Sequence, residues 1–374
     1  MDKCTNKQTE HEEYNSLQKK INFIISKYSN KQNILYSLFY LGQNILISLI
    51  FTKCMYNIQH YINIYLWWTI YSIIQGTIWI GLWVIAHECG HGAFAKSEFV
   101  NDIFGLIIHS FLLVPYYTWQ FSHKKHHKYT NHLIKGETHV PMCKSIYDKL
   151  YINNIIDIIG DDAFSLIKSI ISLFFGWILY LFFNTTGGQV DYKGKILDKN
   201  KSISHFNTSS QLFPPKLKTK IIISDLFICL YLLLIFSSDY FFGFGTSFKW
   251  YWGAYLITNC WLVLYTYLQH TSPSVPHYGN EDFTWLKGAL STIDRSYPFY
   301  IDYLHHHIGS THVLHHLNYK IPFYYAKKAT KELKHILGKK YNYNDTNIIK
   351  SFFDTNNKCK YVESYEGTQW YKNR

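Results

Sequence analysis

The sequence is short of charge and almost without arginine. Charged residues make up 17% of its 374 positions, and Arg295 and Arg374 are the only arginines. Soluble domains carry about 25% charged residues. Hydrophobic residues reach 48% and aromatic residues 19%, which excludes intrinsic disorder, a collagen-like repeat and a compact disulfide scaffold. Abundant Trp and Tyr beside so little charge indicate a protein that crosses a membrane several times.

Cysteine pairs and targeting peptides are also lacking. The seven cysteines are odd in number and include no C-x-x-C, so neither disulfides nor a zinc knuckle is expected. The first 35 residues are polar and contain several acidic residues but no arginine, which excludes a cleavable signal peptide and an organelle transit peptide. The net charge of +12 comes from lysines that form no stacking platform with aromatic residues, so we expect no nucleic-acid partner.

Histidine, in contrast, is abundant and clustered. Eight of the 20 histidines fall in three boxes, one of the form H-x-x-x-H and two of the form H-x-x-H-H. The boxes are His87 and His91; His123, His126 and His127; and His312, His315 and His316. Residues three and four apart share one face of a helix, so each box would project its imidazoles together. Eight imidazoles are too many for one ion and suffice for two, with positions left open for oxygen.

The first box permits a second interpretation. His87, Glu88 and His91 also match H-E-x-x-H, in which two histidines bind zinc and the glutamate is the general base of a metalloprotease. A catalytic zinc needs only three protein ligands, so a membrane zinc protease would leave the other two boxes unexplained. Metal analysis separates the two interpretations, because one zinc supports the protease and two irons support oxygen chemistry.

Six apolar segments have nearly the length of a membrane-spanning helix, about 20 residues. They are 34–52, 61–86, 103–121, 165–183, 221–236 and 250–268. The lysine-rich stretch 184–220 belongs on the cytoplasmic side, and the three boxes must share one side if they form one site. Both conditions hold if 103–121 and 165–183 lie in or on the membrane without crossing it. We therefore expect an all-α integral membrane protein with four crossings, cytoplasmic termini and a cytoplasmic histidine-rich cap.

Histidine-held metal at a membrane surface indicates oxygen activation on a lipid chain. An unactivated C–H bond has no acidic proton, and acid–base catalysis supplies only roughly 10²–10⁴-fold acceleration. A metal cofactor must therefore perform the difficult step, while the protein holds the chain straight and excludes water.

The boxes and their surroundings resemble the membrane fatty acid desaturases, in particular the oleate Δ12 branch. The similar stretches are AHECGHGAF (86–94), LVPY (113–116), WQFSHKKHH (119–127), SHFN (204–207), YLQHT (267–271), PHY (276–278) and THVLHHL (311–317). Glu88 and the step from His306 to His312 are more similar to the Δ12 branch than to the ω3 branch. The chain departs from the family at Phe323 and Tyr325, where histidines are common, and this departure bears on chain-end specificity.

The resemblance implies a desaturase domain over 33–345 between cytoplasmic tails at 1–32 and 346–374. It also implies two iron ions held by the eight box histidines and by a ninth histidine at the end of the fourth span. His270 fits that place, and His306 is the alternative. Glu88 would orient a ligand histidine, and Trp119 is a candidate to contact the substrate.

The implied reaction is the oxygen-dependent insertion of a cis double bond, from oleoyl to linoleoyl, on an acyl lipid or acyl-CoA. Cytochrome b5 and its NADH reductase would supply electrons at the endoplasmic reticulum membrane. An ω3 desaturation, a hydroxylation or a conjugation on the same site remains an alternative.

Overall fold

A computed structural model describes residues 2–150 and 152–374 as a set of helices with very little sheet. The helices are α1 (Asp2–Tyr28), α2 (Ile34–Ile58), α3 (Ile64–His91), α4 (Glu98–Phe111), α5 (Tyr116–Lys128), α6 (Lys144–Tyr147), α7 (Ile152–Ile159), α8 (Asp161–Phe183), η1 (Pro215–Leu217), α9 (Lys218–Phe242), η2 (Phe248–Trp252), α10 (Gly253–His270), α11 (Trp285–Leu290), α12 (Phe299–Leu304), α13 (His312–Leu317), α14 (Phe323–Leu337), η3 (Gly338–Lys340) and α15 (Ile348–Lys358). The strands are β1 (His277–Tyr278), β2 (Asp294–Arg295), β3 (Tyr343–Asn344) and β4 (Thr368–Gln369).

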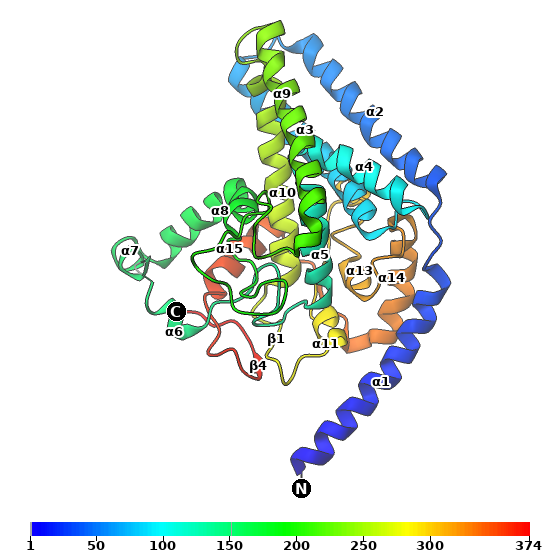
Figure 1. The fold of residues 1–374 in the computed structure, drawn as a ribbon, viewed down its shortest axis with the longest axis vertical. Coiled ribbons are helices and arrows are strands. Elements are labelled where there is room, and N and C mark those ends of the chain that lie inside the picture. The colour runs from blue at the N-terminus through cyan, green and yellow to red at the C-terminus, as the bar shows by residue number, and fades with distance from the viewer. Residues whose placement is uncertain (1, 151) are drawn as a thin grey trace.

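Helices α2, α3, α9 and α10 build the long part of the molecule (Figure 1). The turn between α2 and α3 and the turn between α9 and η2 meet at one end, where Lys249 Nζ donates a 2.6 Å hydrogen bond to Gln59. From that end α3 and α10 run in close contact to their last residues, His91 and His270. The first box and His270 are thereby brought to the same end of the bundle.

Helix α3 is the buried centre of this bundle, with 78% of its most apolar window inside the protein. It begins where the Asn63 side chain accepts hydrogen bonds from the backbone N–H groups of Tyr65 and Leu66. It ends where Gly92 adopts a left-handed conformation with φ +69°, which favours glycine. One uninterrupted helix therefore carries His87 and His91 in its last two turns.

Large apolar side chains face outward on the other long helices. Leu46 on α2, Phe175 on α8 and Leu233 on α9 are 57%, 51% and 66% exposed. Large apolar side chains exposed along long helices fit contact with lipid. The expected all-α membrane protein with several spans is confirmed.

Four helices of the described residues are long and apolar enough to cross a membrane, as expected, but their membership differs from the expectation. They are α2, α3, α8 and the continuous helix Pro215–Phe242. Helix α10 falls short because buried polar residues, among them Thr258, Asn259 and Gln269, lower its hydropathy. Helix α8 qualifies by length and composition, yet it runs across the long axis of the bundle in Figure 1. Segment 103–121 divides into α4 and α5, which meet at an angle of 106°.

The two ends of the chain pack onto the histidine-bearing part of the molecule. Ile21 and Ile24 of α1 lie in one apolar cluster with Leu317 and Leu333. Toward the C-terminus, β4 pairs antiparallel with β1, and β3 pairs in parallel with β2. The regions expected as tails thus contain ordered elements that close the cap.

Candidate metal centre

Four helices deliver the predicted histidines to one place. The last turns of α3 carry the first box, α5 carries the second, α13 carries the third, and His270 is the final residue of α10. All nine side chains are buried except that of His123, which is partly exposed. The nine imidazoles form two neighbouring clusters.

The first cluster takes members from all three boxes. His87, His91, His123, His127 and His315 each place one ligand atom within 4.8 Å of the others. The Nε2 atom of His87 lies 2.8 Å from that of His123 and 3.2 Å from that of His91. His127 Nε2 lies 3.2 Å from His123 Nε2, so the pairs four residues apart converge as helix geometry predicts.

The second cluster is centred on His270. Its Nε2 atom lies 3.1 Å from His126 Nε2 and 3.0 Å from His312 Nε2. His126, His270 and His316 place their ligand atoms within 4.8 Å of one another. The ring centroids of His312 and His316 are 4.5 Å apart, so four imidazoles surround this second point.

Each H-H dipeptide is divided between the clusters. His127 and His315 belong to the first cluster, whereas His126 and His316 belong to the second. Successive residues on an α-helix point about 100° apart, so a single dipeptide can reach two ions. Two boxes of the form H-x-x-H-H therefore suit a paired centre better than two separate sites.

The donor set fits metal ions. When two imidazole nitrogens bind the same ion at about 2.0–2.1 Å and at right angles to each other, the nitrogens lie about 3 Å apart. The converging Nε2 pairs have this separation. Burial lowers the pKa of His312, His315 and His316 well below the ordinary value. These imidazoles are therefore neutral at pH 7, which is the form that binds metal.

The structure places the two candidates for a ninth ligand differently. His270 is central to the second cluster, and the last turn of its helix is held by Arg295, whose Nε donates to the Leu268 carbonyl at 3.1 Å. His306 lies outside both clusters, with its ring 4.5 Å from that of Phe323. Arg295 is fully buried, and no spacing rule in the sequence pointed to its role at the end of α10.

Glu88 is buried beside the first cluster. Its Oε1 atom lies 3.3 Å from Nδ1 of His87, the ring nitrogen opposite the converging Nε2. A carboxylate in this place can fix the ring orientation of a ligand histidine. Tyr319 was not anticipated: its ring stacks on His91 with centroids 4.6 Å apart.

An apolar cavity reaches both clusters. Its lining includes Trp83, Trp119, Trp177 and Leu262 together with His87, His123, His126, His270 and His312. Gly90 makes room for one wall, because a Cβ there would lie 2.5 Å from the Trp119 ring. A second cavity shares Thr138, Trp177, Tyr180, Leu262 and Thr266 with the first, so the two adjoin. Together they offer an apolar space beside the clustered histidines.

Sequence comparison now decides the family, because the model that describes fatty acid desaturases matches residues 64–347. The chain belongs to the fatty acid desaturase family. The chain is 38% identical to a Delta(12) fatty acid desaturase, FAD2, of Calendula officinalis over 83% of its own length and 78% of that protein. It is 36% identical to an oleoyl-12-hydroxylase, FAH12, of Ricinus communis over 92% of its length and 87% of that protein.

A third relative of this desaturase is the omega-6 fatty acid desaturase, endoplasmic reticulum isozyme 1, of Glycine max. The identity is 37% over 82% of the chain and 77% of that protein. The predicted resemblance to the Δ12 branch is confirmed. A zinc protease that used only the first box does not account for a similarity that covers 77–87% of these relatives.

Proposed function

We propose that this protein is a di-iron, oxygen-dependent fatty acid desaturase that introduces a cis double bond at the Δ12 position, converting oleoyl to linoleoyl chains. The observation that carries the proposal is the convergence of nine imidazoles from four helices in two clusters, each of which contributes histidines to the wall of an apolar cavity. The similarity to Delta(12) desaturases supports the position of the double bond.

The two clusters provide the iron ligands in this proposal. His87, His91, His123, His127 and His315 would hold one ion, and His126, His270, His312 and His316 the other. Iron held there supplies oxygen activation, which an unactivated C–H bond requires. An all-imidazole donor set also accepts zinc or copper, so metal identity rests on the family.

The protein's own residues position the chain and keep water away. Trp83, Trp119 and Trp177 give the cavity rigid apolar walls that hold an acyl chain against the clusters. The balanced reaction removes two hydrogen atoms from the chain and consumes one O₂, two electrons and two protons to give two waters. The electrons come from outside the chain, and we propose cytochrome b5 with its NADH reductase as donor.

The membrane arrangement follows from the bundle. We propose that α2, α3, α9 and α10 cross the bilayer, because α3 and α10 run together from the paired turns to the histidine clusters. Helices α4, α5 and α8 would then lie in or on the cytoplasmic leaflet. The endoplasmic reticulum is the proposed membrane, supported by the name of the Glycine max relative.

Hydroxylation of the same chain is the second candidate, because a relative named as an oleoyl-12-hydroxylase matches 92% of the sequence. The names of the two relatives both refer to position 12 of the chain, and the products differ in carrying a double bond or a hydroxyl group. The composition of the products separates them.

The test is expression in a yeast that makes no polyunsaturated fatty acids, followed by lipid analysis that locates any new double bond. Linoleate at the expense of oleate is the expected result, and hydroxylated oleate would favour the second candidate. If neither product forms while the purified protein holds a single zinc, the proposal is wrong.

A further inference from the structure

Two threonine hydroxyls contact histidines of the second cluster from behind. Thr138 Oγ1 lies 3.1 Å from Nδ1 of His126, and Thr130 Oγ1 lies 3.0 Å from Nδ1 of His316. Both contacts are made to the ring nitrogen opposite the one that faces the cluster. A hydroxyl in this place controls how the ring is turned and which of its nitrogens carries the proton.

The direction of one of these hydrogen bonds follows from its neighbour. The Thr130 hydroxyl donates its only hydrogen to the backbone carbonyl of His126 at 2.8 Å. Its oxygen must therefore accept from His316, whose Nδ1 then carries the proton. The Nε2 atom of His316 keeps its lone pair for a metal ion, and Thr130 ties the second box to the third.

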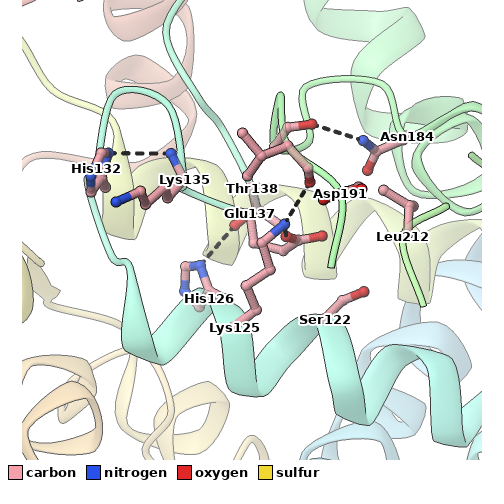
Figure 2. Close-up of polar contacts among 12 residues, drawn as sticks. Ser122, Lys125, His126, His132, Lys135, Glu137, Thr138, Asn184, Asp191 and Leu212 are labelled. Atoms are coloured by element: carbon pink, nitrogen blue, oxygen red, sulfur yellow. Dashed lines mark hydrogen bonds and ion pairs between the residues drawn. The ribbon is translucent and has the colours of Figure 1, made fainter. Parts of the chain in front are cut away.

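Thr138 is itself held in place by a partly buried ion pair. Lys125 and Glu137, the residues directly before His126 and Thr138, join α5 to the following loop with Nζ and Oε2 2.8 Å apart. Figure 2 shows the two contacts side by side, Lys125 with Glu137 and His126 with Thr138. Lys125 also donates to the Val190 carbonyl at 3.1 Å, so three segments meet at this point.

The loop can return to α5 because it turns tightly. His132 Nδ1 accepts hydrogen bonds from the backbone N–H groups of Ile134 and Lys135, at 3.1 and 3.2 Å. The stretch after α8 approaches this loop at Gly188. Glycine is required there, because a Cβ on Gly188 would clash with the carbonyl oxygen of Gly136 in the loop. The backbone thus fixes where Thr138 stands relative to His126.

The first cluster has no equivalent support from hydroxyl groups. Within the described residues, Nδ1 of His87, His91 and His127 has no hydrogen-bond partner, and only Glu88 comes near one of them, at 3.3 Å. Among the described residues, Nδ1 of His270 and of His312 also has no partner, so the threonine contacts single out His126 and His316 within the second cluster.

We propose that Thr130 and Thr138 are positioning residues for the second metal ion: their hydroxyls hold His316 and His126 in the tautomer and orientation that present Nε2. The inference rests on the proposed di-iron function. Losing such a partner of a ligand histidine weakens metal binding by about 10–100-fold. The ion held by the first cluster should be unaffected.

The experiment counts iron in purified full-length protein after dialysis against a weak chelator. Thr138→Val and Thr130→Val keep the side-chain shape and remove the hydroxyl, while Thr138→Ser and Thr130→Ser keep the hydroxyl. Thr292→Val is the matched control, because its buried hydroxyl donates only to the Ala289 carbonyl at 2.8 Å. A thermal melt of each variant reports folding separately.

The parent protein, both Ser variants and Thr292→Val are expected to hold two irons per chain, and the Val variants close to one. Two irons in both Val variants would overturn the inference, as would Ser variants that lose iron as the Val variants do. Should a Val variant not be recovered, Thr138→Ala or Thr130→Ala removes the same hydroxyl with the same expected loss. A parent protein without two irons would contradict the proposed function instead.

Discussion

At the scale of single residues, His270 and His306 give the sharpest contrast, because both are buried histidines and only one lies in a cluster. Replacing His270 by Ala removes a nitrogen 3.0–3.1 Å from two other Nε2 atoms. We expect linoleate formation to fall more than about 100-fold, which exceeds the loss expected when only a hydrogen-bond partner of a metal ligand is removed. His306→Ala should cost less than about tenfold.

The measurement is linoleate per unit of membrane protein, with iron per chain determined on the same preparations. His306→Ala is the matched control, since it deletes the same side chain from a buried position outside both clusters. The reverse order of losses would move the ninth ligand to His306.

Spacing in the sequence was enough to select all eight box histidines, because imidazoles three and four residues apart converge on any helix. It could not assign His126 and His127, or His315 and His316, to one cluster or the other, since that depends on how the helices are rotated against each other. Thr130 and Thr138 carried no signal at all, because threonine is common and its contact is made across a loop.

At the scale of an element, α13 is a helix of six residues that brings three buried histidines to the centre. Burial lowers their pKa well below the ordinary value. The unfolded chain takes up protons on these rings below about pH 6.5, whereas the folded chain does so only at lower pH. The folded form therefore loses stability as the pH falls below about 6.5.

Protons also compete directly with metal for the same nitrogens. We expect iron per chain and the melting temperature to fall together between pH 7 and pH 5, and iron to return when ferrous ion is added at pH 7. Dialysis at both pH values in equal salt is the measurement, with protein kept at pH 7 throughout as control. Iron content that is the same at pH 5 as at pH 7 would contradict ligation by these histidines.

Hydropathy predicted the long apolar elements. It did not predict how segment 103–121 and helix α10 lie relative to the rest of the bundle. Pro115 interrupts the apolar segment 103–121, because proline cannot continue a helix hydrogen-bond ladder; α4 ends at Phe111 and α5 begins directly after Pro115, and hydropathy does not predict the angle between them. Helix α10 reads as less apolar than α8, although it lies against α3 along the bundle. Buried polar residues lower the hydropathy of an inner helix below that of an outer helix. Hydropathy alone therefore cannot tell which of the two crosses the membrane.

At the scale of the whole molecule, both ends of the chain pack onto the part of the structure that carries the histidine clusters. Tyr371 OH, near the C-terminus, donates to the His139 carbonyl at 3.3 Å, and Lys27 of α1 forms a 2.8 Å ion pair with Glu332 of α14. The sequence indicated both ends only as cytoplasmic tails. Their place in the fold depends on contacts between residues hundreds of positions apart, which no local pattern encodes.

The membrane arrangement of the whole chain makes a prediction that sugar attachment can test. Asn207-Thr208-Ser209 is an acceptor sequence in the stretch that joins α8 to α9, and its asparagine is exposed. We propose that this stretch lies in the cytoplasm with the histidine clusters, so Asn207 should remain unmodified in cells. Asn184 is buried and is a poor reporter on either side.

An acceptor sequence inserted between α9 and η2, in the turn that meets Gln59, should be modified, because that turn lies at the opposite end of the bundle. The shift in gel mobility after enzymatic sugar removal reports both sites in one experiment. Modification of Asn207, or of neither site, would contradict four crossings by α2, α3, α9 and α10. Modification of the turn alone would place every histidine of the two clusters on one side of the membrane, as a single paired centre requires.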